Sequence, residues 1–206
     1  MGEPRRGCYI VLEGGEGVGK TTQVQHLAKR LEQEHRAVEV VREPGGDPFA
    51  EAGRELLLGS LPRVPEAEVL MFNAMRAQLL RATVEPALAA GRWVLSDRSR
   101  LSTLAYQGYG HRLDLEWIRA VCALTTQLCG PDLEIVLVVD EATALARRGA
   151  RGTSDRFERL DQDFHRRVAE GYRIEASRQG LPAVDGTGSE DDVAEAVWAL
   201  VAPLLD

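Results

Sequence analysis

The chain has 206 residues, of which 44% are hydrophobic and 28% are charged, and its formal net charge at pH 7 is −7. This length fits one folded unit with a full core, so we expect a single domain over residues 1–206. The isoelectric point of about 5.2 implies repulsion of a nucleic-acid backbone, so no nucleic-acid partner is predicted. No window approaches the ~18 apolar residues of a membrane span, so no membrane-spanning segment is predicted.

The first predicted strand, Cys8–Glu13, leads into a glycine-rich loop and then into a helix predicted over Gly19–Glu34. The loop fits the pattern G-x-x-x-x-G-K-[ST], in which backbone N–H groups and the helix start face an anion. Lys20 would reach the β- and γ-phosphates, and the Thr21 hydroxyl would ligate Mg²⁺. The residues predicted to bind ATP here are Gly14, Gly15, Glu16, Gly17, Val18, Gly19, Lys20, Thr21 and Thr22.

The middle of the chain alternates between apolar runs typical of buried strands and segments with helical periodicity. A second strand is predicted at Ala37–Arg42, a long apolar helix at Pro65–Ala90, and a third strand at Arg92–Asp97. A further helix is predicted at Leu115–Leu128, where Gly130 and the following proline end it.

The last third of the chain continues the alternation. The predicted elements are a strand at Leu133–Val139, helices at Glu141–Arg148 and Asp161–Gln179, a strand at Leu181–Val184 and a terminal helix at Ser189–Leu205. Strands that alternate with helices indicate a parallel sheet with crossover helices. Together with the phosphate loop, they predict an α/β protein of the three-layer P-loop NTPase fold, with a central five-stranded parallel sheet flanked by helices and a lid segment.

Charged residues follow several predicted strands, at the edge where ligands bind in open parallel sheets. Glu13 ends the first strand, Arg42 ends the second, and Asp97 and Arg98 end the third. A basic stretch with Arg147, Arg148, Arg151 and Arg156 flanks a later crossover. A triphosphate with Mg²⁺ does not account for so many arginines, so we expect a second anionic substrate, with Arg98 and Arg42 on an acceptor phosphate.

Six segments in order resemble the bacterial thymidylate kinases, which phosphorylate dTMP. They are Leu-Glu-Gly-Gly-Glu-Gly-Val-Gly-Lys-Thr-Thr-Gln at 12–23, Arg-Glu-Pro-Gly-Gly at 42–46, Glu-Val-Leu-Met-Phe-Asn-Ala-Met-Arg at 68–76, Asp-Arg at 97–98, Ser-Thr-Leu-Ala-Tyr-Gln-Gly at 102–108 and Asp-Arg-Phe-Glu at 155–158. The resemblance implies transfer of the γ-phosphoryl group of Mg-ATP to dTMP, giving dTDP and ADP for dTTP synthesis.

The resemblance also implies how the acceptor is bound. Phe72 would stack on thymine and Arg76 would donate to its carbonyl oxygen, since the two lie four residues apart on one helix face. Tyr106 would pack against the sugar where a ribose 2′-hydroxyl would sit. The full set predicted to bind dTMP is Glu16, Arg42, Pro44, Phe72, Arg76, Arg98, Thr103, Tyr106 and Gln107. Without the resemblance, Phe72 also fits a core position and residues 102–107 also fit an ordinary helix start.

The catalytic residues implied by the resemblance are Lys20, Asp97, Arg98 and Arg151. Thr21 and Asp97 would hold Mg²⁺, the latter through water, and Arg147 would contact ATP. Arg151 would act from a mobile lid over about residues 147–157, because the loop position that carries an arginine in one class of these kinases is Gly17 here.

Two positions depart from the family pattern. Ser99 and Arg100 follow Asp97 and Arg98 where an aromatic residue or histidine is usual, which leaves open what packs beside the acceptor phosphate. Asp47 follows residues 42–46 where threonine is common, and we expect a minor effect.

Three further expectations concern assembly, location and alternatives. The resemblance implies a homodimer, for which the apolar helix around residues 66–82 would serve. The N-terminal residues carry no secretory h-region and the three cysteines no C-x-x-C pair, so we expect a cytoplasmic protein with small buried cysteines and no histidine-built metal site. The alternatives are a kinase for a deoxynucleoside or another pyrimidine monophosphate, a GTP-hydrolysing switch, and a structural domain with a vestigial phosphate loop. A GTP-hydrolysing switch would need an Asn-Lys-x-Asp motif to recognise guanine, and the sequence has none.

Overall fold

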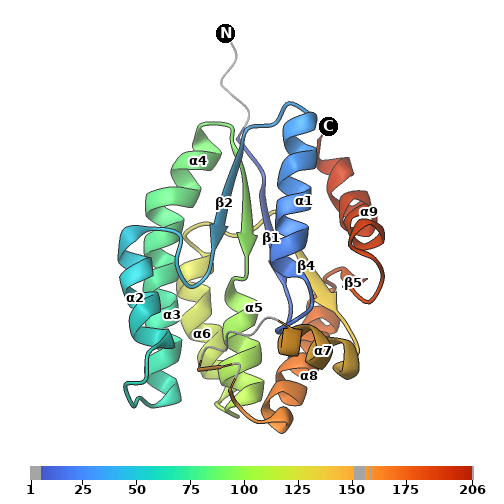
Figure 1. Cartoon of the computed structure of the whole chain (residues 1–206). Coiled ribbons are helices and arrows are strands. Elements are labelled where there is room, and N and C mark those ends of the chain that lie inside the picture. Colours follow the sequence, from blue (N-terminus) through green and yellow to red (C-terminus); the bar gives the residue numbers. More distant parts are fainter. Residues whose placement is uncertain (1–5, 151–155, 158, 206) are drawn as a thin grey trace.

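Five parallel strands form the centre of the structure, a computed structural model that describes residues 6–150, 156–157 and 159–205 (Figure 1). The strands lie in the order β2-β3-β1-β4-β5, and every neighbouring pair is parallel. Their bounds are β1 Tyr9–Glu13, β2 Val38–Arg42, β3 Trp93–Asp97, β4 Leu133–Val138 and β5 Ala183–Asp185. The predicted α/β class and the five-stranded parallel sheet are therefore confirmed.

The central strand β1 is buried on both faces, as expected for a continuous apolar run. Tyr9 and Val11 point into a cluster on one face, while Ile10 and Leu12 point into a cluster on the other. The strand ends at Glu13, which is also fully buried and so must be held by hydrogen bonds.

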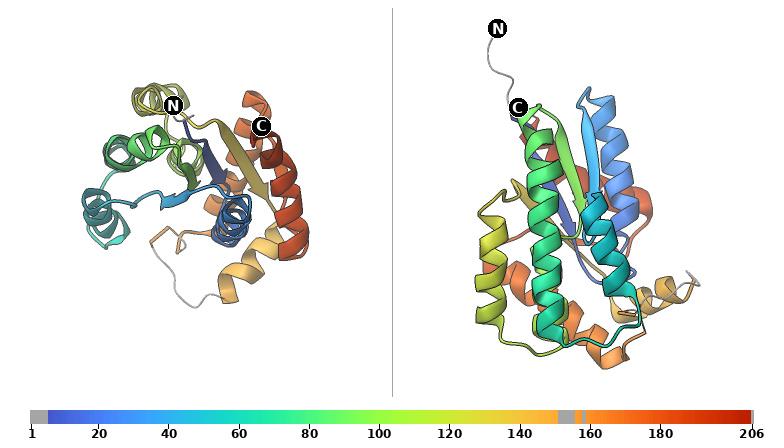
Figure 2. Two further views of the ribbon diagram at one scale, coloured as in Figure 1. Left: turned by 90° about the horizontal axis from the view of Figure 1, so that it is seen from above. Right: turned by 90° about the vertical axis from the view of Figure 1, so that its left-hand side faces the viewer.

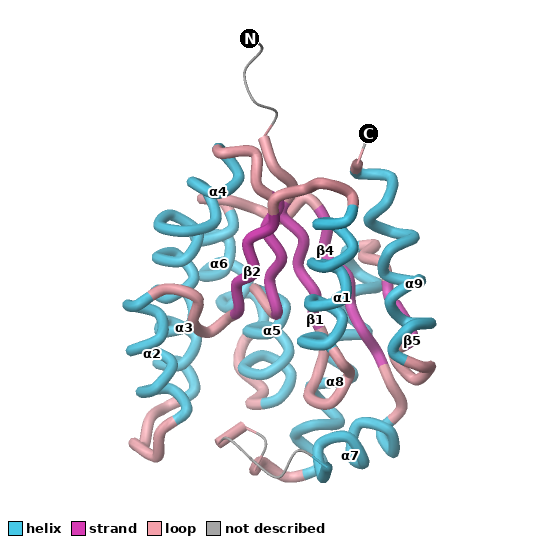
Figure 3. Tube along the Cα trace, turned by 45° about the horizontal axis from the view of Figure 1, so that its top comes forward, coloured by secondary structure: helices cyan, strands magenta, loops and turns pink. Residues whose placement is uncertain are grey.

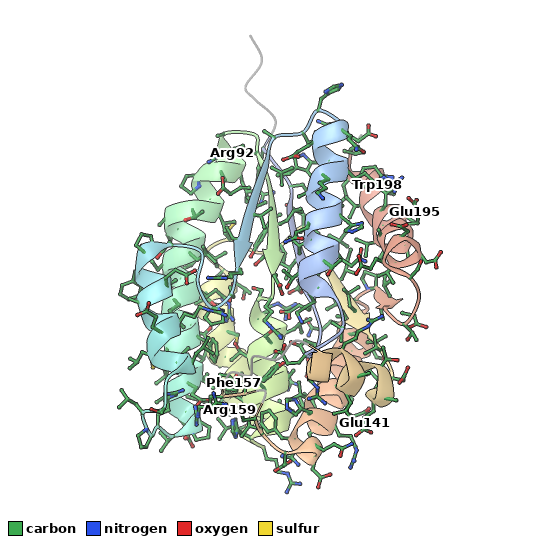
Figure 4. All side chains as sticks on the ribbon, viewed as in Figure 1. Arg92, Glu141, Phe157, Arg159, Glu195 and Trp198 are labelled. Carbon is green, nitrogen blue, oxygen red and sulfur yellow. The ribbon has the colours of Figure 1, made fainter. Side chains whose placement is uncertain are left out.

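Helices α1 (Lys20–Gln33) and α9 (Glu190–Val201) cover one face of the sheet (Figure 2). Arg30 of α1 joins them, because its guanidinium lies 4.4 Å from the ring centroid of Trp198 and pairs with Glu195 (Figure 4). A short 3-10 turn, Ala202–Leu204, follows α9. The predicted terminal helix therefore ends earlier than Leu205 as a regular α-helix.

The opposite face is covered by a longer series of helices. They are α3 Pro65–Leu79, a π-helical turn Leu80–Val84, α4 Glu85–Ala89, α5 Arg100–Thr103, a π-helical segment Leu104–Gly110, α6 Leu115–Thr126 and α8 Gln162–Gln179. The single helix predicted over 65–90 is thus a continuous helical segment, Pro65–Ala89, that contains a π-helical turn. This turn precedes Pro86, which has no N–H with which to continue the α-helical hydrogen-bond pattern.

Two helices differ from the sequence prediction. Helix α2, Pro48–Leu58, was not predicted, and it begins at Asp47, whose carboxylate accepts a hydrogen bond from the N–H of Ala50 at 2.8 Å. The helix predicted to reach Leu128 ends at Thr126. Cys122 is buried as expected, whereas Cys8 and Cys129 are only half-buried, which corrects that prediction.

The carboxyl ends of the strands meet the phosphate loop, α5 and α7 (Glu141–Ala150), as the tube view shows (Figure 3). In the described part of the chain, no helix combines the length and the apolar character of a membrane span. The edge of the sheet that carries the predicted site residues is therefore assembled from segments far apart in the sequence.

Candidate active site

The phosphate loop joins β1 to α1 and leaves the start of α1 open to an anion. Gly19 occupies the position before the helix with φ 95°, and no side chain caps the helix. Gly14 has φ 143°, and a Cβ atom there would lie 2.5 Å from the carbonyl oxygen of Leu137. The loop path therefore requires glycine, and the first N–H groups of α1 have no capping side chain.

Lys20 lies inside this loop with only 6% of its surface exposed. Its Nζ donates a hydrogen bond to the carbonyl oxygen of Gly15 at 2.7 Å. Burial, with a smaller effect from the nearby Arg98 guanidinium, lowers the pKa of Lys20 to about 8. A polyanion bound at the loop would relieve both effects.

Thr21 and Asp97 lie together where the loop meets the end of β3. The hydroxyl of Thr21 donates to Oδ2 of Asp97 at 2.6 Å. Hydroxyl and carboxylate oxygens are the hard ligands that Mg²⁺ takes beside phosphate and water, so this pair fits that ion. Among the described residues there is no cluster of three or more His, Cys, Asp or Glu side chains that could hold a metal.

Arg98 follows β3 with a positive φ of 78°, a strained conformation for a residue with a side chain. Its Nη1 donates to the carbonyl oxygen of Gly14 at 2.9 Å and to the hydroxyl of Tyr172 at 3.1 Å. Its Nη2 pairs with Glu16 of the loop and donates to the hydroxyl of Tyr106 at 3.3 Å. The guanidinium is thus held between the phosphate loop and Tyr106, one of the residues predicted to bind dTMP.

A cavity of about 230 Å³ opens beside the loop. It contains most of the residues predicted to bind dTMP together with part of the loop. The lining residues are Glu16, Gly17, Gly19, Lys20, Thr21, Glu43, Pro44, Arg54, Leu58, Phe72, Arg76, Arg98, Ser99, Ser102, Thr103, Tyr106, Gln107 and Phe157. A single compartment therefore joins the phosphate-binding loop to a distant end lined by Phe72, Arg76, Thr103 and Gln107, which we call the base end.

Arg76 forms the floor of the base end and is almost completely buried. Its Nε donates to Glu43 at 2.7 Å, and its Nη1 donates to Asn73 at 3.0 Å and to the sulfur of Cys122 at 3.9 Å. Its Nη2 donates to the hydroxyl of Thr103 at 3.0 Å. A guanidinium has five N–H groups, so one on Nη2 has no acceptor among the described residues.

Gln107 supplies the complementary group at the base end. It lies one helical turn after Thr103, and its Nε2 donates to Glu68 at 3.2 Å. Its Oε1 is buried and receives no hydrogen bond from any described residue. Among the described residues, an N–H of Arg76 and the Oε1 of Gln107 at the base end therefore have no hydrogen-bond partner.

Aromatic rings enclose the same cavity. The ring centroid of Phe157 lies 6.1 Å from that of Phe72 and 5.9 Å from that of Tyr106. Phe157 lies among the helices below the strand ends, where Figure 4 labels it. The hydroxyl of Tyr106 donates to Glu16 at 2.9 Å, which places Tyr106 between the base end and the loop.

Some predicted site residues lie elsewhere. Arg42 is more than half exposed, does not line the cavity, and pairs with Glu51 at 3.0 Å. Arg147 donates to the carbonyl oxygen of Gly186 at 2.9 Å, beside the loop after β5. Gly14, Gly15, Val18, Thr22 and Asp97 do not line the cavity either, although Asp97 contacts Thr21.

The lid is only partly described. Arg151, the predicted lid arginine, lies outside the described residues. Arg148 borders a second, smaller cavity between the loop, β4, α7 and α8, while Arg156 pairs with Glu68 of α3. Among the described arginines of this stretch, Arg148 therefore borders the same cavity as the phosphate loop, whereas Arg156 lies against α3.

Comparison with known proteins decides the family. The sequence profile described as Thymidylate kinase matches residues 12–197. A thymidylate kinase of Deinococcus radiodurans is 42% identical over 200 residues, and the match covers 96% of this chain and 97% of that protein. A thymidylate kinase of Synechococcus sp. strain JA-2-3B'a(2-13) is 45% identical over 199 residues, and the match covers 96% of this chain and 95% of that protein. The chain belongs to the thymidylate kinase family.

A solved thymidylate kinase structure agrees with this assignment. The crystal structure from Ehrlichia chaffeensis superposes with a TM-score of 0.79 at 27% identity and covers 95% of this chain and 99% of that one. Membership in the thymidylate kinase family makes the chain a kinase that uses ATP. The resemblance drawn from six sequence segments, the predicted fold and the predicted class of enzyme are confirmed.

The sequence analysis gave no role to several residues that shape this thymidylate kinase site. Glu13 accepts hydrogen bonds from the N–H of Ser99 at 2.7 Å and from the hydroxyl of Ser102 at 2.7 Å, and so holds the start of α5. Ser99 also donates to Glu43 at 3.2 Å, so a serine–carboxylate contact stands where the family pattern has an aromatic residue or histidine. A buried acid at a strand end was the available signal for Glu13, whereas the cavity position of Phe157 required the fold.

Proposed function

We propose that the chain transfers the γ-phosphoryl group of Mg-ATP to dTMP, and that the cavity between the phosphate loop and Arg76 is the dTMP site. The observation that carries this proposal is that two residues lining the base end each keep a group without a described partner, an N–H donor on Arg76 and the acceptor Oε1 on Gln107. Thymine and uracil offer a carbonyl oxygen next to a ring N–H, which match this pair, whereas cytosine offers an amino group next to a ring nitrogen acceptor. Membership in the family supports the same substrate.

Arg98 is proposed to bind the acceptor phosphate. It lines the cavity between the base end and the loop, and its guanidinium already pairs with the carboxylate of Glu16. Guanidinium groups bind phosphate oxygens through paired N–H groups, so a phosphate can take over the donors that Glu16 now uses.

Lys20 and the first N–H groups of α1 are proposed to hold the donor phosphates. Thr21 and Asp97 would hold Mg²⁺, which supplies charge neutralisation on the polyphosphate. The acceptor oxygen needs no general base, because the second pKa of a phosphate monoester is about 6. Catalysis then depends on alignment and on compensating charge, for which Lys20, Arg98, Asp97 and the lid residue Arg151 are the proposed residues, with Arg147 as an ATP contact.

The substrate assignment is tested by offering dTMP, dUMP, dCMP and thymidine with Mg-ATP and measuring ADP release. We expect the highest kcat/KM with dTMP, a much lower value with dCMP and no turnover of thymidine, which lacks an acceptor phosphate. Turnover of thymidine above that of dTMP would make the chain a deoxynucleoside kinase, the main alternative.

Two broader features are also proposed. The chain would act as a homodimer through the exposed side of α3, where Leu70 is 54% exposed and Ala74 lies one turn later. A cytoplasmic location is supported by the need for ATP and by three free cysteines, which fit a reducing compartment. The unit of function would be one domain of residues 1–206 with a mobile lid over about 147–157.

A further inference from the structure

Glu68 is a charged side chain that lies inside the protein next to the base end of the cavity. It sits on α3, one turn before Phe72 and two before Arg76, and its side chain is only 1% exposed. It does not line the cavity itself. A buried carboxylate needs several donors, so its partners show what it does.

The two oxygens of Glu68 have different partners. Oε1 accepts from Nε of Arg63 at 3.3 Å and from Nη1 of Arg156. Oε2 accepts from Nε2 of Gln107 at 3.2 Å, and Nε2 of His111 lies 3.8 Å away, beyond hydrogen-bond distance. Two guanidinium groups therefore hold one oxygen and aim the other at the amide of Gln107.

Arg63 is itself held in place. Its Nη1 donates to the carbonyl oxygen of Leu56, in the last turn of α2, at 3.1 Å and to that of Leu61, in the connection between α2 and α3, at 2.9 Å. The orientation of the carboxylate is thus set by the backbone at the end of α2 as well as by Arg156. The carboxylate of Glu68 is therefore a hydrogen-bond acceptor in a fixed position.

A carboxylate can only accept, so it accepts only the NH₂ end of the Gln107 amide. Rotating that amide by half a turn would place its Oε1 against Oε2 of Glu68, two acceptors in contact with no hydrogen between them. Oε1 of Gln107 is accordingly turned to the other side, where it is buried without a described donor. Glu68 therefore fixes the orientation of the amide of Gln107, a residue that lines the cavity.

We propose that Glu68 is a positioning residue for base selection: it fixes the Gln107 amide so that an acceptor, and not a donor, meets the base of the nucleotide. A base with a ring N–H at this place, as in thymine or uracil, is then favoured over cytosine, whose ring nitrogen is an acceptor. The inference rests on the proposed function, because it takes Gln107 to meet the base.

The test is Glu68→Gln, with kcat/KM measured for dTMP and for dCMP. A glutamine at this position can present either a carbonyl or an NH₂ group, so Gln107 gains access to both orientations. We expect the ratio of kcat/KM for dTMP to that for dCMP to fall by about tenfold or more, with kcat at saturating dTMP nearly unchanged. The remaining N–H of Arg76 still opposes the cytosine amino group, so some selection persists.

Glu66→Gln is the matched control, since Glu66 lies on the same helix and is exposed. Its dTMP to dCMP ratio should equal that of the parent protein. An unchanged ratio in Glu68→Gln overturns the inference. If that variant is too unstable to assay, Glu68→Asp decides by the same ratio, because it keeps a charge near the arginines and withdraws the carboxylate from Gln107.

Gln107→Leu separates this inference from the proposed function. If Gln107→Leu leaves the ratio unchanged, Gln107 does not meet the base, and the assignment of the base end is wrong. If it lowers the ratio while Glu68→Gln does not, only the positioning role fails. The double variant should show the ratio of Gln107→Leu alone, whereas a further fall would mean that Glu68 acts by another route and would overturn the inference.

Discussion

The charge of Lys20 depends on whether the phosphate loop holds an anion. Its pKa is lowered to about 8, chiefly by burial, so the free protein loses this proton as the pH rises through about 8. Bound polyphosphate favours the charged form and raises the pKa again. ATP binding near this pH therefore takes up protons, and the affinity for ATP falls as the pH rises above it.

We expect an uptake of about half a proton per ATP at pH 8 from this residue. Calorimetry in two buffers with different ionisation enthalpies measures it. Lys20→Met should abolish the uptake as well as weaken binding. An equal uptake in the variant would assign the proton to another group.

Arg98 is the residue on which we expect the alignment of the acceptor phosphate to depend most. Arg98→Lys keeps one charge but loses the forked donors that now reach Gly14, Tyr172 and Glu16. We expect kcat to fall by on the order of a hundredfold, because donors to the transferring and accepting groups act in the transition state. Steady-state kinetics at saturating dTMP measure this fall. Arg81→Lys, at an exposed position on the π-helical turn, serves as the control, and a loss confined to KM would reduce Arg98 to a binding role.

At the scale of single residues, the sequence pointed to candidate phosphate-binding side chains but not to the residues that hold such side chains in place. A contiguous motif identified Lys20 and Thr21, because local order alone builds a phosphate loop. Arg42 was predicted from its place after a strand, yet its side chain turns to Glu51, a choice made by a helix that the pattern did not reveal. Glu68 received no role, since its meaning lies in partners 39 and 88 residues away.

Helix α2 begins at Asp47 and carries Arg54 and Leu58 into the cavity wall. The carboxylate of Asp47 caps the helix by accepting the N–H of Ala50. Asp47→Ala should lower the free energy of unfolding by about 1 kcal/mol, whereas Asp47→Thr keeps a capping oxygen and should cost much less. Urea denaturation of the three proteins measures the difference, and equal losses for alanine and threonine would exclude a capping role.

Strand positions were predictable because five short apolar runs separate the helical patterns, and their bounds differ from the structure by at most two residues. Helix α2 was missed although its start carried a signal, because Asp47 and Pro48 are residue types that favour the cap and the first position of a helix. The π-helical segment after Thr103 has no signal in residue spacing. Such elements are set by packing against α3, α6 and α8.

On the whole-molecule scale, the exposed side of α3 carries the proposed dimer contact. Leu70 is 54% exposed there, and Leu124 on the neighbouring α6 is 67% exposed. Leu70→Glu should place like charges across a two-fold interface, so we expect a monomer of 22.6 kDa in place of a dimer in sedimentation analysis. Leu145→Glu on α7 is the control, and a parent protein that already sediments as a monomer would contradict the proposal.

The alternation of strands and helices was enough to predict one parallel sheet, but not which side chains would share a cavity. Segments around residues 16, 43, 76, 98, 107 and 157 meet there only because the strand order brings their ends together. The family resemblance supplied this information before the structure did, since six ordered segments carry the record of a common fold.

The four hydrogen bonds that hold Arg76 in place have an entropic consequence. An arginine side chain confined to one rotamer loses roughly 2 kcal/mol of conformational freedom, and here that loss is complete once the chain has folded. Docking a nucleobase therefore demands no further ordering of this side chain. The floor of the pocket is therefore preorganised. Variants that loosen Arg76, such as Asn73→Ala, should weaken the binding of dTMP, mainly through a less favourable entropy of association.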